Sequence, residues 1–335
     1  MSGAFRWTPE LEDALHRFLV DSGVDIGPFR VEPVGDGHSN LTYVLRGEGR
    51  TLVLRRPPAP PLPPGANDVL REAGILDALQ TGAVPVPAVL ARGQAGEVFD
   101  VPFFVMTYSP GVVLGARTPD AIATPEDRRR IGDGLVDALV ALHGIDWRAA
   151  GVRGRPEGSN LRHHARLGRL IAAADGTPPA AFAELDAWLV AHAPDEAGAA
   201  LLHNDLRLGN VLVTSTAPAR ITAVLDWELA AVGDPLADLG YLLASWPEPE
   251  RAPTPVQAFG LAALEPGFPT VAELAARYAD RSGRDLSALR WHVVNAQRKL
   301  AVLYEYSRRR GTDPYYADPG TVTAFLEAAA AEIEA

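Results

Sequence analysis

The residues best suited to chemistry lie in the stretch LLHNDLRLGNVLV, Leu201–Val213. Two apolar runs, typical of short buried strands, flank a polar loop that contains His203, Asp205 and Asn210. A further acid, Asp226, ends the next apolar run along the chain. If the two runs after the loop form a small hairpin-like ribbon, Asn210 and Asp226 meet at one rim of it. An amide oxygen and a carboxylate are hard ligands that suit Mg²⁺ together with substrate phosphates.

Asp205 shares the loop with Asn210, so it would lie within reach of a phosphate held by such a metal. A carboxylate at that point can accept the proton of an attacking hydroxyl and orient the hydroxyl in line with the phosphorus. In phosphoryl transfer, the protein does little covalent chemistry, but it must position the reacting groups strictly. That requirement would explain why a polar loop is held between two apolar runs.

These residues form a longer pattern, H-x-D-x-x-x-x-N followed by D-W-E and then D-P-x-x-D-L. The pattern resembles that of the aminoglycoside phosphotransferase and choline kinase superfamily, which shares the protein-kinase fold. The form HNDLRLGN, preceded by LVLRRPP, is most similar to the branch related to the kinase-like domain of some acyl-CoA dehydrogenase proteins. The resemblance covers most of the chain and implies a small-molecule kinase that uses ATP and Mg²⁺, with a hydroxyacyl compound as acceptor.

In the second half of the chain, the resemblance implies one role for each matching residue. Asp205 matches the catalytic aspartate, and Asn210 and Asp226 match the metal ligands. His203 matches a histidine that holds the catalytic loop in place. Asp238 matches a buried acid that accepts backbone N–H groups of that loop.

In the first half, the stretch GDGHSNLTY resembles the turn that covers the nucleotide phosphates. Its glycines would let the backbone approach the phosphates, and its serine could donate to one of them. A later segment matches the connection between lobes, whose backbone would bind adenine. The implied nucleotide-binding residues are Gly35, Gly37, Ser39, Arg55, Glu72, Met106, Thr107 and Ser109.

The phosphate-anchoring lysine of the family has no counterpart here, because Lys299 is the only lysine of the chain. Strand alternation places Val53 and Arg55 on one face, so Arg55 is the candidate cation and Glu72 its partner. Arginine stays ionised and can bind phosphate oxygens bidentately. The alternative is that neither Arg55 nor Arg56 contacts nucleotide and that the protein is a catalytically silent nucleotide-binding regulatory module.

The elements that must position these residues fall into two lobes. We expect an α+β protein with the two-lobed protein-kinase-like fold. The N-lobe, residues 1–108, would be a small antiparallel sheet with one interposed helix that binds nucleotide. The C-lobe, residues 109–335, would be mostly helical and carry the catalytic loop, the metal site and the substrate region. Helix starts are predicted at Thr8-Pro9 and Thr124-Pro125, and a capping box at Thr270 with Glu273.

Composition excludes several classes of function. The formal net charge of -11 argues against a general nucleic-acid binder, which needs clustered positive charge. The absence of cysteine excludes disulfides and thiolate metal sites. The first residues carry early acids and no apolar core, so we expect no secretory signal, and no run of apolar residues is long enough to span a membrane. We therefore expect a cytoplasmic protein that binds neither nucleic acid nor membrane, in an oligomeric state that the sequence leaves open.

The acceptor is harder to predict than the reaction. A pocket for polycationic aminoglycosides would be lined with carboxylates, yet residues 251–335 hold ten acids and ten lysines plus arginines. This balance favours a neutral or anionic small molecule with a hydroxyl group, such as a hydroxyacyl-CoA or a hydroxy acid. An aminoglycoside or macrolide antibiotic kinase stays the alternative. A kinase of protein substrates is disfavoured, because no A-P-E element follows Asp226.

Overall fold

The structure of the protein is a computed structural model that describes residues 7–35, 40–59, 67–80, 82–173, 179–311 and 313–334. The chain divides into two compact units, and neither unit is one continuous segment. Unit 1 comprises Met1–Thr81, Val86–Pro110 and Leu225–Glu228. Unit 2 comprises Gly82–Pro85, Gly111–Val224 and Leu229–Ala335.

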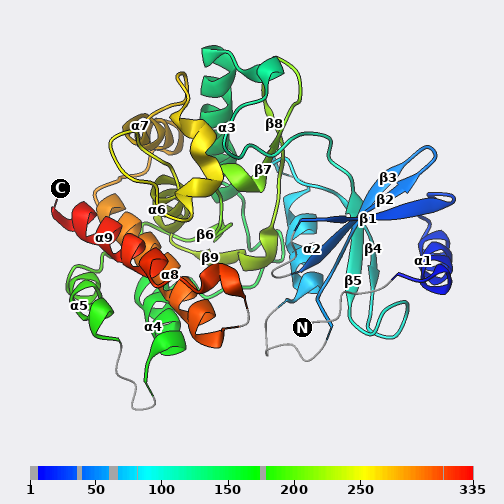
Figure 1. The fold of residues 1–335 in the computed structure, drawn as a ribbon, viewed down its shortest axis with the longest axis horizontal. Coiled ribbons are helices and arrows are strands. Elements are labelled where there is room, and N and C mark those ends of the chain that lie inside the picture. The colour runs from blue at the N-terminus through cyan, green and yellow to red at the C-terminus, as the bar shows by residue number, and fades with distance from the viewer. Residues whose placement is uncertain are drawn as a thin grey trace. The chain divides into compact units, whose positions relative to one another are not determined.

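Unit 1 is built on an antiparallel five-stranded sheet in the order β1-β2-β3-β5-β4. Its strands are coloured blue to cyan in Figure 1. The strands alternate along the chain with turns and with two helices. The bounds of these strands and helices are α1 Pro9–Asp21, β1 Phe29–Val34, β2 Leu41–Gly47, β3 Thr51–Arg56, α2 Val69–Leu79, β4 Val89–Gly93 and β5 Phe103–Thr107.

The two faces of this sheet carry different side chains. Leu52 and Leu54 of β3 are buried in a core that also contains Leu15 and Leu19 of α1. Because side chains alternate along a strand, Arg55 lies on the opposite face from these leucines. Arg55 contacts α2, so the alternation that buries the core also turns this cation toward the helix.

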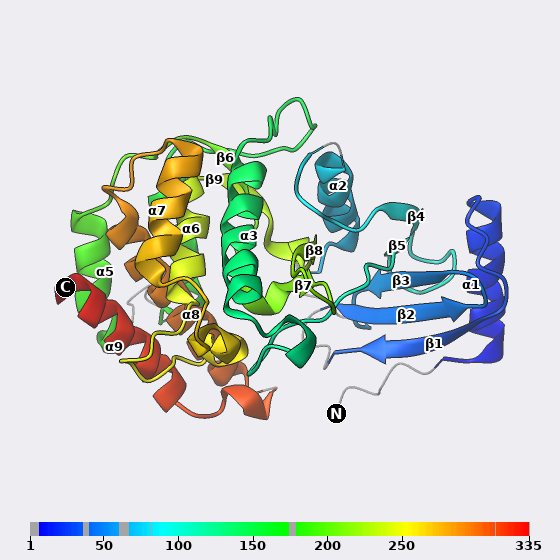
Figure 2. The ribbon, with the colours of Figure 1, turned by 90° about the horizontal axis from the view of Figure 1, so that it is seen from above.

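Unit 2 is mostly helical and contains two short antiparallel ribbons, β6-β9 and β7-β8. Figure 2 shows α3, α6 and α7 standing side by side in this unit. The bounds are α3 Pro125–His143, α4 Ser159–Ile171, α5 Ala183–Ala191, β6 Ala200–Leu202, β7 Val211–Val213, β8 Ile221–Val224, β9 Ala231–Gly233, α6 Pro235–Ala244, α7 Val271–Ser282, α8 Leu289–Arg310 and α9 Gly320–Glu334.

The helix starts predicted from the sequence are confirmed. Thr8 and Thr124 each precede a first-turn proline, and their hydroxyls accept a backbone N–H of the helix. At α7, the Thr270 hydroxyl accepts the N–H of Glu273, and the Glu273 carboxylate accepts the N–H of Thr270. The α+β composition is also confirmed, with the small antiparallel sheet in the first part of the chain and most helices in the second.

Two features differ from the expectation. The strand β9 was not predicted, and its three residues pair with β6 directly before α6. The division into units also differs, because Leu225–Glu228, expected in the C-lobe, associates with unit 1, and Gly82–Pro85, expected in the N-lobe, associates with unit 2. Among the described residues, no helix combines the length and the apolar composition that crossing a membrane requires.

Helices α6 and α8 approach each other closely at Gly240, and both pack in one core with α9. A Cβ at Gly240 would lie 2.7 Å from the carbonyl carbon of His292, a backbone atom that a side-chain adjustment cannot move away. Close approach of the two helices therefore depends on the absence of a side chain at this position.

We expect Gly240→Ala to destabilise the protein by about 1–3 kcal/mol, because the added methyl overpacks a helix crossing. Gly74 in α2 is the matched control, since a Cβ there has no atom within 4 Å. Gly74→Ala should stabilise by about 0.5–1 kcal/mol through helix propensity. Urea unfolding of both variants measures the two effects, and equal destabilisation would contradict the close crossing at Gly240.

Candidate active site

The loop that follows β6 is anchored by Asp238 of α6. Asp238 Oδ2 accepts the backbone N–H of His203 at 2.7 Å, and its Oδ1 accepts that of Asn204 at 2.7 Å. The carboxylate is completely buried, and His143 Nε2 lies 3.3 Å from Oδ2. Burial opposes ionisation, but the bond from His143 and the N–H of His203 outweigh it and hold the pKa of Asp238 below its usual value. The predicted role of Asp238 as a buried acceptor is therefore confirmed.

The loop adopts a left-handed backbone conformation at Asn204, with φ of 67°. Asparagine adopts this conformation more readily than most residues. The Asn204 side chain also holds the loop, because its Nδ2 donates to the Leu229 carbonyl oxygen at 2.9 Å. Next to it, Asp205 N donates to Nδ1 of the buried His203 ring at 3.2 Å. The histidine thus contacts the loop backbone directly, which suits a holding role.

The Asp205 carboxylate is fixed through both of its oxygens. The Tyr241 hydroxyl of α6 donates to Oδ1. Asn210 Nδ2 donates to Oδ2 at 2.7 Å and to the Asp205 carbonyl oxygen at 2.8 Å. A carboxylate has lone pairs beyond these bonds and can still accept the proton of a substrate hydroxyl. The Asn210 amide nitrogen faces Asp205, which leaves its Oδ1, the atom a metal would need, outside these contacts.

Two cations that sequence reasoning left without a role lie beside this carboxylate. Arg207 Nε is 3.7 Å from Asp205 Oδ1. Lys299 of α8 donates to the Asn204 carbonyl oxygen at 2.5 Å, and its Nζ lies 4.6 Å from the centre of the Tyr241 ring. Burial lowers the pKa of Lys299, while Asp205 and Asp238 act in the opposite direction. One feature of the sequence singles out this residue, because Lys299 is the only lysine of the chain.

Unit 1 gathers a second cluster, centred on Arg55. Its Nε lies 2.9 Å from Glu72 Oε2, so the predicted pair is present. Its Nη2 lies 2.6 Å from Asp226 Oδ1 and 3.4 Å from Glu228 Oε2. Glu228, which sequence reasoning missed, also accepts from Asn40 Nδ2 at 2.9 Å.

This cluster holds three carboxylates around one guanidinium. Burial and the charges of Asp226 and Glu228 raise the pKa of Glu72 to about 7, although Arg55 counteracts them. Burial opposes the charge of Arg55, but Glu72, Asp226 and Glu228 outweigh it and raise the pKa of Arg55. Negative charge is therefore in excess, which suits a divalent cation. The part of the chain that the structure describes holds no group of three or more His, Cys, Asp or Glu residues able to bind a metal, but Mg²⁺ on substrate phosphates needs only one or two carboxylates.

Asp226 also has a left-handed backbone, with φ of 65°. It follows β8, whose last residue Val224 pairs with Val211, the residue after Asn210. The register therefore agrees with the ribbon that the sequence suggested. The convergence of Asn210 and Asp226 on one metal stays a prediction.

The other predicted nucleotide-binding residues are only partly described. Gly35 has a φ of 74°, a conformation that favours glycine, while Gly37 and Ser39 lie outside the described residues. Met106 belongs to β5, and the half-buried Ser109 follows that strand. Thr107 N already donates to the Ala88 carbonyl oxygen at 2.9 Å, so this N–H is not available to an adenine ring.

A sheet unit with an arginine–glutamate pair and a helical unit with an anchored Asp–Asn loop define the class of protein-kinase-like phosphotransferases. The chain belongs to the phosphotransferase enzyme family, whose family model matches residues 30–292. The predicted membership in this superfamily and the predicted fold are thereby confirmed.

Individual relatives agree with this assignment. Acyl-CoA dehydrogenase family member 10 of Mus musculus is 31% identical over 276 residues, which cover 81% of this chain but 26% of that protein. This chain thus spans about a quarter of that relative's length. A crystal structure from Ralstonia eutropha, described provisionally as an aminoglycoside phosphotransferase, has a TM-score of 0.78 and 27% identity and covers 95% of this chain and 97% of its own. The aminoglycoside phosphotransferase APH(4)-Ia, in a ternary complex with AMP-PNP and hygromycin B, shares the fold with a TM-score of 0.59 at 17% identity, covering 94% and 98% of the two chains.

We expect Asp238→Asn to destabilise the protein by about 3–5 kcal/mol near neutral pH, because the loop loses a charged acceptor and an amide N–H faces backbone donors. Since the folded state lowers the pKa of Asp238, its stabilising contribution is present above the unfolded pKa of about 4 and is lost as pH falls below it. The stability gap between wild type and variant should therefore narrow in acid.

Urea unfolding at several pH values measures this gap. The exposed Asp13 of α1 provides the control, because Asp13→Asn should change stability little at any pH. If the difference in free energy of unfolding between wild type and Asp238→Asn stays constant between neutral pH and acid, the Asp238 carboxylate is not ionised in the folded protein, and the account is contradicted.

Proposed function

We propose that the protein transfers the γ-phosphoryl group of ATP to the hydroxyl of a small molecule in a Mg²⁺-dependent reaction in the cytoplasm. The observation that carries the proposal is the Asp205 carboxylate, fixed by Tyr241 on one oxygen and by Asn210 on the other. A carboxylate held in this way is pre-organised to orient a hydroxyl group, and positioning is the main demand of phosphoryl transfer.

In this proposal, each cluster supplies part of the reaction. Asp205 accepts the proton of the attacking hydroxyl, while Tyr241 and Asn210 keep its carboxylate in place. Arg55, held by Glu72, binds phosphate oxygens. Asn210 Oδ1 and the Asp226 carboxylate would hold Mg²⁺, which, when bound, neutralises charge on the phosphate oxygens. The excess of carboxylates around Arg55 supports a cation at Asp226.

The surroundings of Asp205 support an acceptor that is anionic or neutral. Arg207 and Lys299 both lie beside the catalytic loop, and positive charge disfavours a polycation such as an aminoglycoside. The Arg207 guanidinium also lies 5.1 Å from the centre of the Phe259 ring, whose side chain is exposed. A cation beside an exposed aromatic ring suits a molecule with both apolar and anionic parts. We propose a hydroxyacyl-CoA or a related hydroxy acid.

The experiment is a comparison of acceptors by ADP release. The purified protein is incubated with ATP and Mg²⁺ and a panel of hydroxyacyl-CoAs, free hydroxy acids, aminoglycosides and macrolides. The proposal predicts turnover with one of the first two groups. Turnover with antibiotics alone would contradict the proposed acceptor, and no turnover across a broad panel would favour a silent nucleotide-binding module.

With the acceptor in hand, we expect Asp205→Asn to reduce turnover by about 10²–10⁴-fold, because the proton acceptor is lost while the shape of the side chain is kept. Tyr241→Phe removes only the hydroxyl that holds the carboxylate and should reduce turnover by about tenfold, the effect of one hydrogen bond to a charged group. AMP-PNP affinity, measured by calorimetry, should change little in both variants. Wild-type turnover in Asp205→Asn would contradict the role assigned to this residue.

A further inference from the structure

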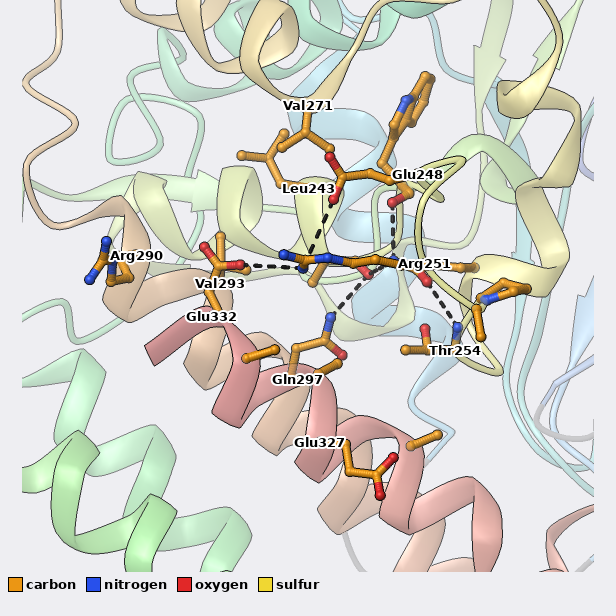
Figure 3. Close-up of a pocket in the computed structure, with 18 of the residues that line it drawn as sticks. Leu243, Glu248, Arg251, Thr254, Val271, Arg290, Val293, Gln297, Glu327 and Glu332 are labelled. Carbon is orange, nitrogen blue, oxygen red and sulfur yellow. Dashed lines mark hydrogen bonds and ion pairs between the residues drawn. The ribbon is translucent and has the colours of Figure 1, made fainter. Parts of the chain in front are cut away.

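Unit 2 contains a cavity of about 560 Å³ that is separate from the catalytic loop. It lies among the end of α6, the segment after it, and parts of α7, α8 and α9 (Figure 3). Much of the lining is apolar and includes Leu243, Trp246, Val271 and Val293. The volume falls in the range of about 300–1,000 Å³ that is usual for small-molecule sites.

The cavity and the catalytic loop lie on opposite faces of α8. Arg290, Val293 and Gln297, spaced three and four residues apart, line the cavity along one face of the helix. Lys299 contacts the catalytic loop and stands two residues after Gln297, which is about 200° around the helix. A ligand in the cavity would therefore not occupy the place of the phosphate acceptor at Asp205.

Two buried polar atoms at the cavity have no hydrogen-bond partner within the described residues. They are Gln297 Oε1 and Thr254 Oγ1, on side chains that are each 4% exposed. Gln297 Nε2 donates to the Ala244 carbonyl oxygen at 3.3 Å, and this bond orients the side-chain amide. The other atom of the amide, Gln297 Oε1, accepts no hydrogen bond from a described residue. Figure 3 shows Gln297 and Thr254 on the same side of Arg251. A buried polar atom without a partner costs about 1–3 kcal/mol, so a group that satisfies it is strongly favoured.

The charges around the cavity favour a neutral occupant. Arg251 Nη1 lies 4.0 Å from Glu248 Oε2 and 3.9 Å from Glu332 Oε2, so its charge is offset by these carboxylates. The other charged residues of the lining are Arg290 and Glu327, so the lining has no excess of positive charge that would favour an anion. A carboxylate ligand would also place negative oxygens against Gln297 Oε1, which can only accept. A hydroxyl or a primary amide, in contrast, can donate to Gln297 Oε1 and accept from the Thr254 hydroxyl.

We propose that this cavity is a second small-molecule site, which binds a neutral compound with an apolar body and a hydroxyl or primary amide head. Gln297 Oε1 accepts from the head and the Thr254 hydroxyl donates to it. The apolar wall around Trp246 and Val293 contacts the body. This site is independent of the proposed phosphotransfer, because none of its residues belongs to the Asp205 or Arg55 clusters.

The test uses the full chain and two probes of the same shape, benzamide and benzoate, titrated by calorimetry and ligand-observed NMR. Benzamide carries the predicted head, whereas benzoate cannot donate to Gln297 Oε1. We expect benzamide to bind in the millimolar range and benzoate to bind at least tenfold more weakly. Ala328→Leu, which fills the cavity from α9, should abolish benzamide binding.

Thr254→Val is the decisive variant, because its hydroxyl bonds to no described residue and can be removed without loss of a bond. It should bind benzamide about tenfold more weakly while unfolding at the same or a higher urea concentration. Gln297→Leu should weaken binding similarly, and Thr323→Val on the exposed surface of α9 is the matched control with wild-type binding. Failure of benzamide to bind, equal binding of benzoate, or wild-type affinity in Thr254→Val would each overturn the proposal.

Discussion

The geometry of the catalytic loop depends on one buried charge, the Asp238 carboxylate. A carboxylate with no exposure to solvent is tolerated only if its oxygens are satisfied, and the N–H groups of His203 and Asn204 satisfy it at 2.7 Å. The first turn of α6 also favours a negative charge through the helix dipole. The same helix supplies Tyr241, which holds Asp205. One short helix thus fixes both the backbone of the loop and the Asp205 side chain, for which we propose the catalytic role.

The Arg55 cluster shows a different use of charge. A single guanidinium faces Glu72, Asp226 and Glu228, and burial together with the charges of Asp226 and Glu228 raises the pKa of Glu72 to about 7. A divalent cation bound at Asp226, as proposed, would offset this negative charge. An arginine in this place keeps its charge under all relevant conditions, whereas a buried lysine can lose it. The proposed replacement of the family lysine by Arg55 is therefore compatible with Asp226 as a proposed metal ligand.

Local rules predicted much of this structure from the sequence. The caps at Thr124 and Thr270 depend on residues within one turn, and the Arg55–Glu72 pair follows from strand alternation and the family pattern. Asp238 was predicted only because it stands in a recognisable motif. Tyr241 was missed because LGYLLA is typical of a buried helix, and the hydroxyl's partner lies 36 residues away. The left-handed conformation of Asp226 was also missed, since nothing in its neighbours demands it.

The central claim is that Asn210 and Asp226 hold one divalent cation together with the nucleotide. Mn²⁺ binds the same oxygen ligands as Mg²⁺ and can be counted by electron paramagnetic resonance in the presence of AMP-PNP. The account predicts one nucleotide-dependent Mn²⁺ site in the wild type, weakened at least tenfold by Asp226→Asn and by Asn210→Ala, but not by the exposed control Asp13→Asn. Wild-type Mn²⁺ affinity in either of the first two variants would contradict it.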